Sequence, residues 1–123
     1  MKKKVDRVFY PHGLGHFVGL DVHDVGQKVS YKTERILEPG NLITVEPGIY
    51  FIPFLLEKSF AREDLKGILN EELIRTYFDF GGIRIEDDVF ILDNTIENFN
   101  EDLPRTTEEI EKFIAENNVH HKK

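Results

Sequence analysis

The sequence predicts a single domain of the α+β class, residues 1–123, and three observations support that class. Residues 42–46 alternate between two faces in the manner of a β-strand. Residues 55–80 are rich in charge and have apolar side chains at helical spacing. Residues 106–114 have the pattern of a capped, amphipathic helix. Because strand and helix patterns occupy separate stretches, we expect the helices to form a layer beside a sheet.

The first third of the chain is expected to supply two short strands around a glycine-rich turn. The first strand candidate covers residues 7–10, and the turn follows in residues 11–15, with the sequence PHGLG. The second candidate covers residues 16–22, of which four are apolar. Residues 26–38 predict a loop or an irregular strand. The order places His16 directly after a turn whose glycines let the backbone approach another group closely.

A turn at residues 38–41, EPGN, leads into the clearest strand of the sequence. Proline presets φ in such a turn and glycine tolerates positive φ. In residues 42–46, the even-numbered side chains share one face and the odd-numbered ones the other. Pro47 cannot donate to a ladder, so regular pairing is expected to stop just after Glu46. Residues 49–52 then resume an apolar strand.

The middle of the chain predicts helices followed by a further strand. One or two helices are expected in residues 55–80. Their apolar positions are Leu65, Ile68, Leu69, Leu73, Ile74 and Tyr77. Gly81 and Gly82 end the helical pattern, and residues 83–92 alternate as a strand, with residues 84, 86 and 88 on one face.

The last helix has a marked start. Thr106 can cap it, and Glu109, three residues later, completes a capping box. The apolar stripe consists of Ile110, Phe113 and Ile114. Residues 117–123 are expected to form a flexible tail.

Composition excludes several classes of protein. The 123 residues include 16 basic and 23 acidic side chains, for a net charge of -7, and five of the basic ones lie in lysine runs at the two ends. An acidic body argues against a nucleic-acid surface. The absence of cysteine excludes disulfide scaffolds and thiolate metal sites. With no apolar run long enough to span a bilayer and no secretory pattern, we expect a cytoplasmic protein without a membrane partner.

Three side chains are candidates for a metal site: His16 after the glycine turn, Glu46 at a strand end, and Glu86 on a later strand. A carboxylate on a buried strand face needs a partner, a metal or a raised pKa. One imidazole and two carboxylates suit Mn²⁺, Co²⁺, Fe²⁺ or Zn²⁺. The same residues also fit a structural interpretation, in which Arg84 and Glu86 form a surface charge pair. Spacing alone leaves both interpretations open.

Three sequence blocks closely resemble those of the prolidase and aminopeptidase P group of pita-bread metallopeptidases. The blocks are FYPHGLGHFVGLDVHD at residues 9–24, LITVEPGIY at residues 42–50, and GGIRIEDD at residues 81–88. They occur in the family's order, and the resemblance as a whole covers residues 8 to about 104. The resemblance implies the C-terminal half of a pita-bread fold, an antiparallel curved sheet with flanking helices. Residues 1–123 would then be a partial catalytic domain.

The resemblance also implies a dinuclear divalent metal site. His16 would be the imidazole ligand. Glu46 would be a terminal carboxylate ligand of the same metal, and Glu46 would also transfer a proton. Glu86 would bridge both metals. Manganese is the first expectation, with cobalt, zinc and iron as alternatives.

Further residues are implied to act on the substrate. His12 and His23 match two histidines that contact the substrate and stabilise the tetrahedral intermediate. Arg84 matches an arginine beside the bridging glutamate, which orients the carboxylates. Lys32, with Arg35 nearby, occupies the position of an arginine that binds the carboxylate of a dipeptide. A lysine keeps the charge but lacks the two-pronged donor geometry.

The implied reaction is hydrolysis of Xaa-Pro dipeptides, by attack of a metal-bridging hydroxide on the peptide bond before proline. The long insert between Glu46 and Glu86 resembles that of the dipeptidases. The alternatives are an aminopeptidase P, which releases an N-terminal residue next to proline, a non-catalytic pita-bread interaction module, and a fragment that binds metal weakly.

The resemblance implies that part of the site is absent from this chain. The family uses five metal ligands, and two aspartates upstream of the histidine block have no match here. We therefore expect the isolated chain to be an inactive fragment, with the N-terminal half of the catalytic domain as its partner. An apolar face left without that half predicts self-association, as a homo-oligomer.

Overall fold

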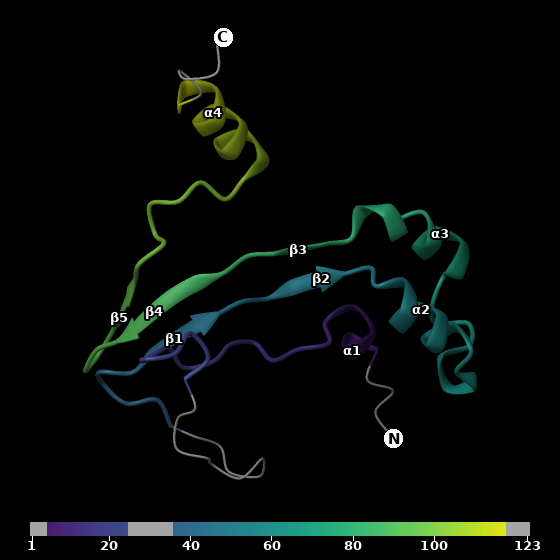
Figure 1. Ribbon diagram of the computed structural model, residues 1–123, viewed down its shortest axis with the longest axis horizontal. Helices are drawn as coiled ribbons and strands as arrows, with labels where there is room; N and C mark the ends of the chain where they lie inside the picture. The colour runs from purple at the N-terminus through teal and green to yellow at the C-terminus, as the bar shows by residue number, and fades with distance from the viewer. Residues whose placement is uncertain (1–4, 25–35, 118–123) are drawn as a thin grey trace.

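The computed structural model describes residues 5–24 and 36–117. The chain is built around a long antiparallel β-ribbon (Figure 1). A three-stranded sheet has the order β1-β4-β5, and a second sheet pairs β2 with β3. The strands are β1 (Leu42–Val45), β2 (Gly48–Tyr50), β3 (Gly82–Arg84), β4 (Asp87–Ile91) and β5 (Ile96–Asn98). Antiparallel sheets with separate helices confirm the predicted α+β class.

One register runs through both sheets. Thr44 pairs with Asp88 before the interruption, and Gly48 pairs with Arg84 after it. Four positions on one strand thus match four on the other, and no residue is inserted between the two sheets. Counting two places inward from either pair puts residue 46 directly opposite residue 86. Side chains directly opposite each other lie on the same face of an antiparallel pair.

Proline causes the interruption between the two sheets. The backbone N–H of Ile85 donates to the carbonyl of Pro47 at 3.1 Å. Pro47 has no N–H with which to return a hydrogen bond. The ribbon therefore lacks regular pairing beside Glu46 but keeps its register. The sequence predicts this stop in the pairing just after Glu46.

A segment of residues 14–18 lies along the free edge of β1. The N–H groups of Thr44 and Glu46 donate to carbonyls of this segment at 2.8 and 2.7 Å. Gly15 is required for this approach, because a Cβ there would lie 1.8 Å from the carbonyl oxygen of Thr44. The glycine-rich turn thus serves the close backbone approach that the sequence predicts.

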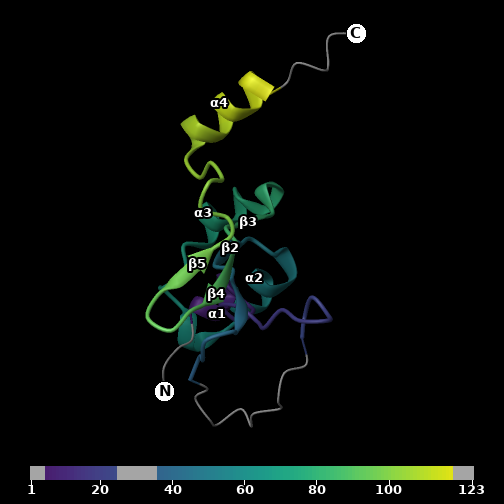
Figure 2. The same cartoon turned by 90° about the vertical axis from the view of Figure 1, so that its left-hand side faces the viewer.

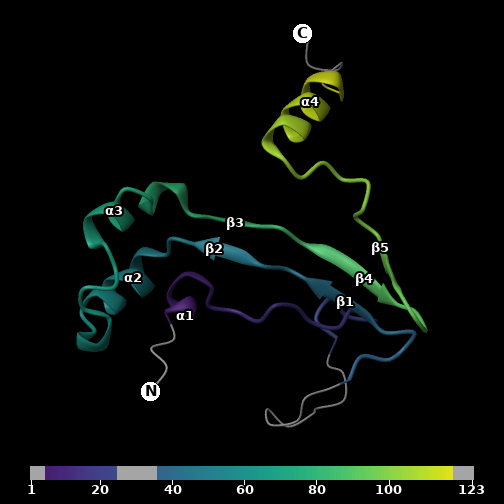
Figure 3. The ribbon, with the colours of Figure 1, turned by 180° about the vertical axis from the view of Figure 1, so that it is seen from behind.

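The helices gather mainly at one end of the ribbon, as the opposite views in Figures 1 and 3 show. They are α1 (Asp6–Phe9), α2 (Pro53–Phe60) and α3 (Glu71–Arg75), with 3-10 turns at Glu63–Leu65 and Phe78–Phe80. Their buried cluster consists of Val8, Leu56, Leu65 and Ile74. This cluster is the main hydrophobic core of the described part of the chain, and Val89 is buried outside it, in β4.

The last helix, α4 (Thr107–Asn117), projects away from the sheets (Figure 2). The predicted capping box is confirmed, since the N–H of Thr106 donates to Glu109 Oε2 at 2.9 Å and the N–H of Glu109 donates to Thr106 Oγ1 at 3.2 Å. The apolar stripe is exposed at Ile110, Phe113 and Ile114. The expected tail at residues 117–123 lies outside the described residues except for Asn117, which ends the helix.

Other element predictions are also confirmed. The turn at residues 38–41 closes with a hydrogen bond from Asn41 N–H to the Glu38 carbonyl at 3.0 Å. The strand predicted at residues 42–46 is β1, which ends one residue earlier, at Val45. The helical pattern of residues 55–80 is formed by α2 and α3, separated by a turn. In the part of the chain that the structure describes, no helix is long and apolar enough to cross a membrane.

The strand predictions in the first third are wrong. Of residues 7–10, the first three belong to helix α1 and Tyr10 follows it, because one helical turn buries Val8 against the core. Residues 16–22 contain only an isolated bridge at Phe17, because the backbone turns back and the N–H of Asp24 donates to the carbonyl of Phe17 at 3.0 Å. Of the region predicted as a loop or irregular strand, residues 26–35 lie outside the described residues.

Two later strand predictions need correction. The apolar strand of residues 49–52 ends at Tyr50, because Pro53 begins helix α2. The strand of residues 83–92 is divided into β3 and β4, because Ile85 lies opposite the proline of the partner strand. Strand β5 was not predicted from the sequence.

Candidate metal centre

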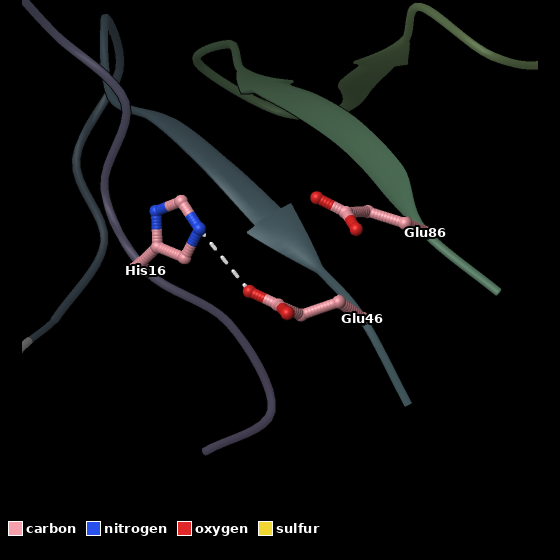
Figure 4. A group of neighbouring side chains, drawn as sticks. All are labelled: His16, Glu46 and Glu86. Carbon is pink, nitrogen blue, oxygen red and sulfur yellow. Dashed lines mark ion pairs between the residues drawn. The ribbon is translucent and has the colours of Figure 1, made fainter. Parts of the chain in front are cut away.

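Three neighbouring stretches of backbone bring the candidate metal ligands together. His16 comes from the segment beside β1, Glu46 directly follows β1, and Glu86 directly precedes β4. One ligand atom from each lies within 4.8 Å of the others. Figure 4 shows the three side chains converging from these stretches. The two glutamates meet because the ribbon register places them opposite each other. The position of His16 depends on the close packing of the glycine-rich segment against β1.

Glu46 is the most buried of the three, with 6% of its surface exposed. Its carboxylate has a donor on each oxygen. The hydroxyl of Thr44 donates to Oε1 at 3.0 Å, and Arg84 Nη1 lies 2.9 Å from Oε2. These partners offset the cost of burying a carboxylate and fix its plane.

The imidazole of His16 has a defined orientation. Its Nδ1 lies 3.0 Å from the carbonyl oxygen of Phe17. A carbonyl only accepts, so Nδ1 is the donor nitrogen and the neutral ring has its lone pair on Nε2. That nitrogen lies 3.2 Å from Glu46 Oε1. Two acceptors face each other at this distance, and the contact requires a positive charge between them, which is either a proton or a metal ion.

The donor set fits a divalent cation. Two ligands bonded at about 2.0–2.2 Å to one cation, at roughly 90–110° to each other, lie about 2.8–3.6 Å apart. The separation of 3.2 Å between His16 Nε2 and Glu46 Oε1 falls in that range. Glu86 adds a second carboxylate from the more exposed side. Imidazole and carboxylate ligands without sulfur suit manganese, iron, cobalt or zinc.

Arg84 lies between the two carboxylates. Its Nη1 is 2.9 Å from Glu46 Oε2 and 3.7 Å from Glu86 Oε2. Its Nε donates to the hydroxyl of Tyr50 at 2.7 Å. The bond to Tyr50 is the main reason that the pKa of Arg84 is raised, and the two carboxylates add to the effect. The guanidinium therefore compensates charge beside the candidate ligands.

His12 joins this group through Tyr50. Its Nδ1 lies 2.7 Å from the carbonyl of Gly13, so this nitrogen donates and Nε2 accepts from the Tyr50 hydroxyl at 2.9 Å. Gly48 makes room for the tyrosine, because a Cβ there would lie 2.6 Å from its hydroxyl oxygen. Sequence reasoning missed Tyr50. The signal was available, since residue 50 shares the strand face of residue 46.

Of the remaining predicted site residues, His23 is described by the structure and lies beside His16. The ring of His23 packs edge-on against that of His16, with centroids 4.3 Å apart. His23 thus adjoins the candidate ligand directly. Lys32 and Arg35 lie outside the described residues.

Comparisons with known proteins find similar peptidases. The model of metallopeptidase family M24 matches residues 2–93. The Xaa-Pro dipeptidase of Homo sapiens is 47% identical over 120 residues, covering 88% of this chain and 24% of the relative. Proline aminopeptidase P II from Yersinia pestis matches with a TM-score of 0.63 at 37% identity, covering 90% of this chain and 22% of that one. Aminopeptidase PepP from Pseudomonas aeruginosa has a TM-score of 0.62 at 36% identity, covering 89% and 21%.

The comparisons confirm the predicted fold. The similar structures are aminopeptidase P enzymes, which have the pita-bread fold, and this chain reproduces part of it. The chain spans about a quarter of the length of the curated relatives it matches. All three sequence blocks lie within the region matched by the family model.

Proposed function

Because this chain belongs to metallopeptidase family M24, we propose that it supplies the imidazole and carboxylate side of a metal centre that hydrolyses Xaa-Pro dipeptides. The observation that carries this proposal is the contact of His16 Nε2 with Glu46 Oε1 at 3.2 Å, with Glu86 alongside. The Xaa-Pro dipeptidase of Homo sapiens supports the choice of substrate, at 47% identity. We propose a cytoplasmic location for the protein.

We propose a dinuclear site with manganese as its first candidate metal and cobalt, zinc or iron as alternatives. His16 and Glu46 would bind one cation, and Glu86 would bridge to the second. Bound divalent cations polarise a carbonyl and activate water near neutral pH. The absence of thiolate ligands supports this choice of metals.

The chain's own residues have distinct roles in the proposed reaction. Glu46 takes up and delivers the proton of the attacking water, and Arg84 holds its Oε2 in place at 2.9 Å. His12 and His23 contact the substrate and stabilise the charge that develops on its carbonyl oxygen. Tyr50 orients His12, because its hydroxyl lies 2.9 Å from Nε2.

Aminopeptidase P activity is the second candidate, because the similar solved structures include aminopeptidase P enzymes. The two activities differ in whether the residue after Xaa is a C-terminal proline. We propose that Lys32 binds the dipeptide carboxylate, which would favour dipeptides. In a protein with the complete catalytic fold, cleavage of Gly-Pro over a Gly-Pro-Ala tripeptide would support the dipeptidase, and the reverse preference would support the aminopeptidase. A non-catalytic interaction module has no physical need for this convergence of ligands.

We propose that the rest of the catalytic fold is needed for turnover. By resemblance, two aspartate ligands complete the family's centre, and this sequence has no match to them. The isolated chain should therefore bind metal weakly and hydrolyse little Gly-Pro. Exposed apolar side chains, including Ile49, Ile83 and Ile85 on one face of the ribbon, support self-association. A strictly monomeric sedimentation profile at micromolar concentration would contradict that part.

Calorimetric titration with Mn²⁺ tests the proposed site. We compare the wild-type chain with a His16→Ala, Glu86→Ala double variant. Binding that is present in the wild type and lost in the variant supports the site. Equal binding by both would place the metal elsewhere and refute the ligand assignment.

A further inference from the structure

Thr44 has a buried hydroxyl next to the candidate ligands. Only 4% of the residue is exposed. Its side chain lies on the same strand face as that of Glu46, two residues later. A buried hydroxyl needs hydrogen-bond partners to offset the loss of water. The two partners of this hydroxyl belong to two different ligand residues.

The direction of both hydrogen bonds is determined. The backbone N–H of His16 can only donate, and it lies 3.0 Å from Thr44 Oγ1. The oxygen therefore accepts there and has one proton to give. That proton points to Glu46 Oε1, which lies 3.0 Å away. The chain of donors runs from the His16 backbone through the hydroxyl to the carboxylate.

The hydroxyl acts on the same carboxylate oxygen that faces the imidazole. Glu46 Oε1 receives the bond from Thr44 and lies 3.2 Å from His16 Nε2, whereas Arg84 occupies Oε2. A second link joins the same residues, since the N–H of Thr44 donates to the carbonyl of His16 at 2.8 Å. Thr44 thus fixes one ligand's carboxylate and the other ligand's backbone at once.

We propose that Thr44 is a positioning residue of the metal centre, whose hydroxyl holds His16 and Glu46 at the spacing of two ligands of one cation. The inference rests on the proposed function and adds a residue that contacts no metal. Groups that orient metal ligands through hydrogen bonds typically contribute 10- to 100-fold to metal affinity. The hydroxyl reduces the freedom of the carboxylate to rotate before a cation binds.

Two substitutions separate the hydroxyl from the shape of the side chain. Thr44→Val keeps the branched shape and removes the hydroxyl, and Thr44→Ser keeps the hydroxyl and removes the methyl group. We would titrate each full chain with Mn²⁺ by calorimetry and record the electron paramagnetic resonance spectrum of bound Mn²⁺. Circular dichroism would establish that each variant is folded. We expect roughly 10- to 100-fold weaker binding and an altered spectrum for Thr44→Val, and binding within about threefold of wild type for Thr44→Ser.

The outcomes distinguish this inference from the proposed function. No binding by the wild type would mean that this chain does not hold the cation without the rest of the catalytic fold, and it would overturn the inference together with the proposal that the chain binds metal alone. Equal binding by the wild type and Thr44→Val would overturn the inference alone. A Thr44→Ser variant as weak as Thr44→Val would also overturn it, because packing rather than the hydroxyl would then be responsible. If Thr44→Val does not fold, the serine variant decides: near wild-type affinity supports the role and a tenfold loss refutes it.

Discussion

The helical end of the molecule and the ligand-bearing break in the ribbon are held together by different interactions. At the helical end, a cluster of apolar side chains is almost fully buried, and it consists of Val8, Leu56, Leu65 and Ile74. At the break, the buried residues are Thr44 and Glu46, and hydrogen bonds and charge satisfy them. Apolar packing tolerates some rearrangement, whereas a polar network depends on each partner.

The comparison shows how a site can be positioned with little core around it. Strand register places Glu46 opposite Glu86, and the edge segment adds His16. Each placement depends on backbone hydrogen bonds rather than on apolar burial. We therefore expect changes at the helical end to reduce stability and changes at the break to reduce metal affinity.

The largest expected effect on stability is that of Leu56→Ala. Leu56 is fully buried, and truncation of a buried leucine costs roughly 2–5 kcal/mol. Urea unfolding of the metal-free chain would measure the loss. Leu20→Ala is the matched control, because Leu20 is fully exposed, and a surface change should stay within about 0.5 kcal/mol. Similar losses for the two variants would show that the cluster is not the stabilising core.

Gly15→Ala should affect both properties. The new Cβ would overlap the carbonyl of Thr44, so the edge segment must move away from β1. We expect a loss of roughly 1–3 kcal/mol in unfolding free energy, as in other overpacked sites. Mn²⁺ affinity should also fall, because His16 moves with the segment.

Gly13→Ala is the matched control for that change. A Cβ at Gly13 would come no closer than 3.8 Å to its nearest neighbour, the carbonyl oxygen of Gly15. It should bind Mn²⁺ as the wild type does. If Gly15→Ala also retained wild-type affinity, the close approach of the segment to β1 would not be what positions the imidazole.

The sequence was sufficient for the elements with strong local signals. The turn at residues 38–41 and the capping box at Thr106 are formed by their own residues, and strand β1 has the alternating pattern of a strand in its own sequence. The family blocks also identify His16, Glu46 and Glu86 as candidate ligands. Local chemistry determines such features, so a short stretch of sequence is enough to predict them.

The other features depend on contacts between distant parts of the chain. A short apolar run such as residues 7–10 fits helix or strand, and packing of Val8 against Leu56 decides for helix α1. The pairing of Glu46 with Glu86 depends on a register across about forty residues, which alternation alone does not specify. Strand β5 is only three residues long and pairs with β4.

The smallest expected effect concerns the ion pair between Arg105 and Asp87, which ties the segment before α4 to strand β4. Arg105 Nη1 donates to Asp87 Oδ2 at 3.1 Å, and Nη2 contacts Oδ1. The hydrogen bonds from Arg105 are the main reason that the pKa of Asp87 is lowered, and Asn98 adds to the effect. Both side chains are partly exposed, so the contribution to stability should be small.

The sign of its pH dependence follows from that lowered pKa. A carboxyl group whose pKa is lower in the folded state stabilises the fold above its unfolded pKa, about 3.9 for aspartate. This stabilisation disappears as the pH falls through the folded value. Arg105→Gln should therefore lower the urea midpoint at pH 7 and change it little at pH 2. Asp87→Asn should remove the same pH dependence. If Arg105→Gln lowered the urea midpoint as much at pH 2 as at pH 7, the effect of Arg105 would come from packing or from its bond with the Asn100 carbonyl.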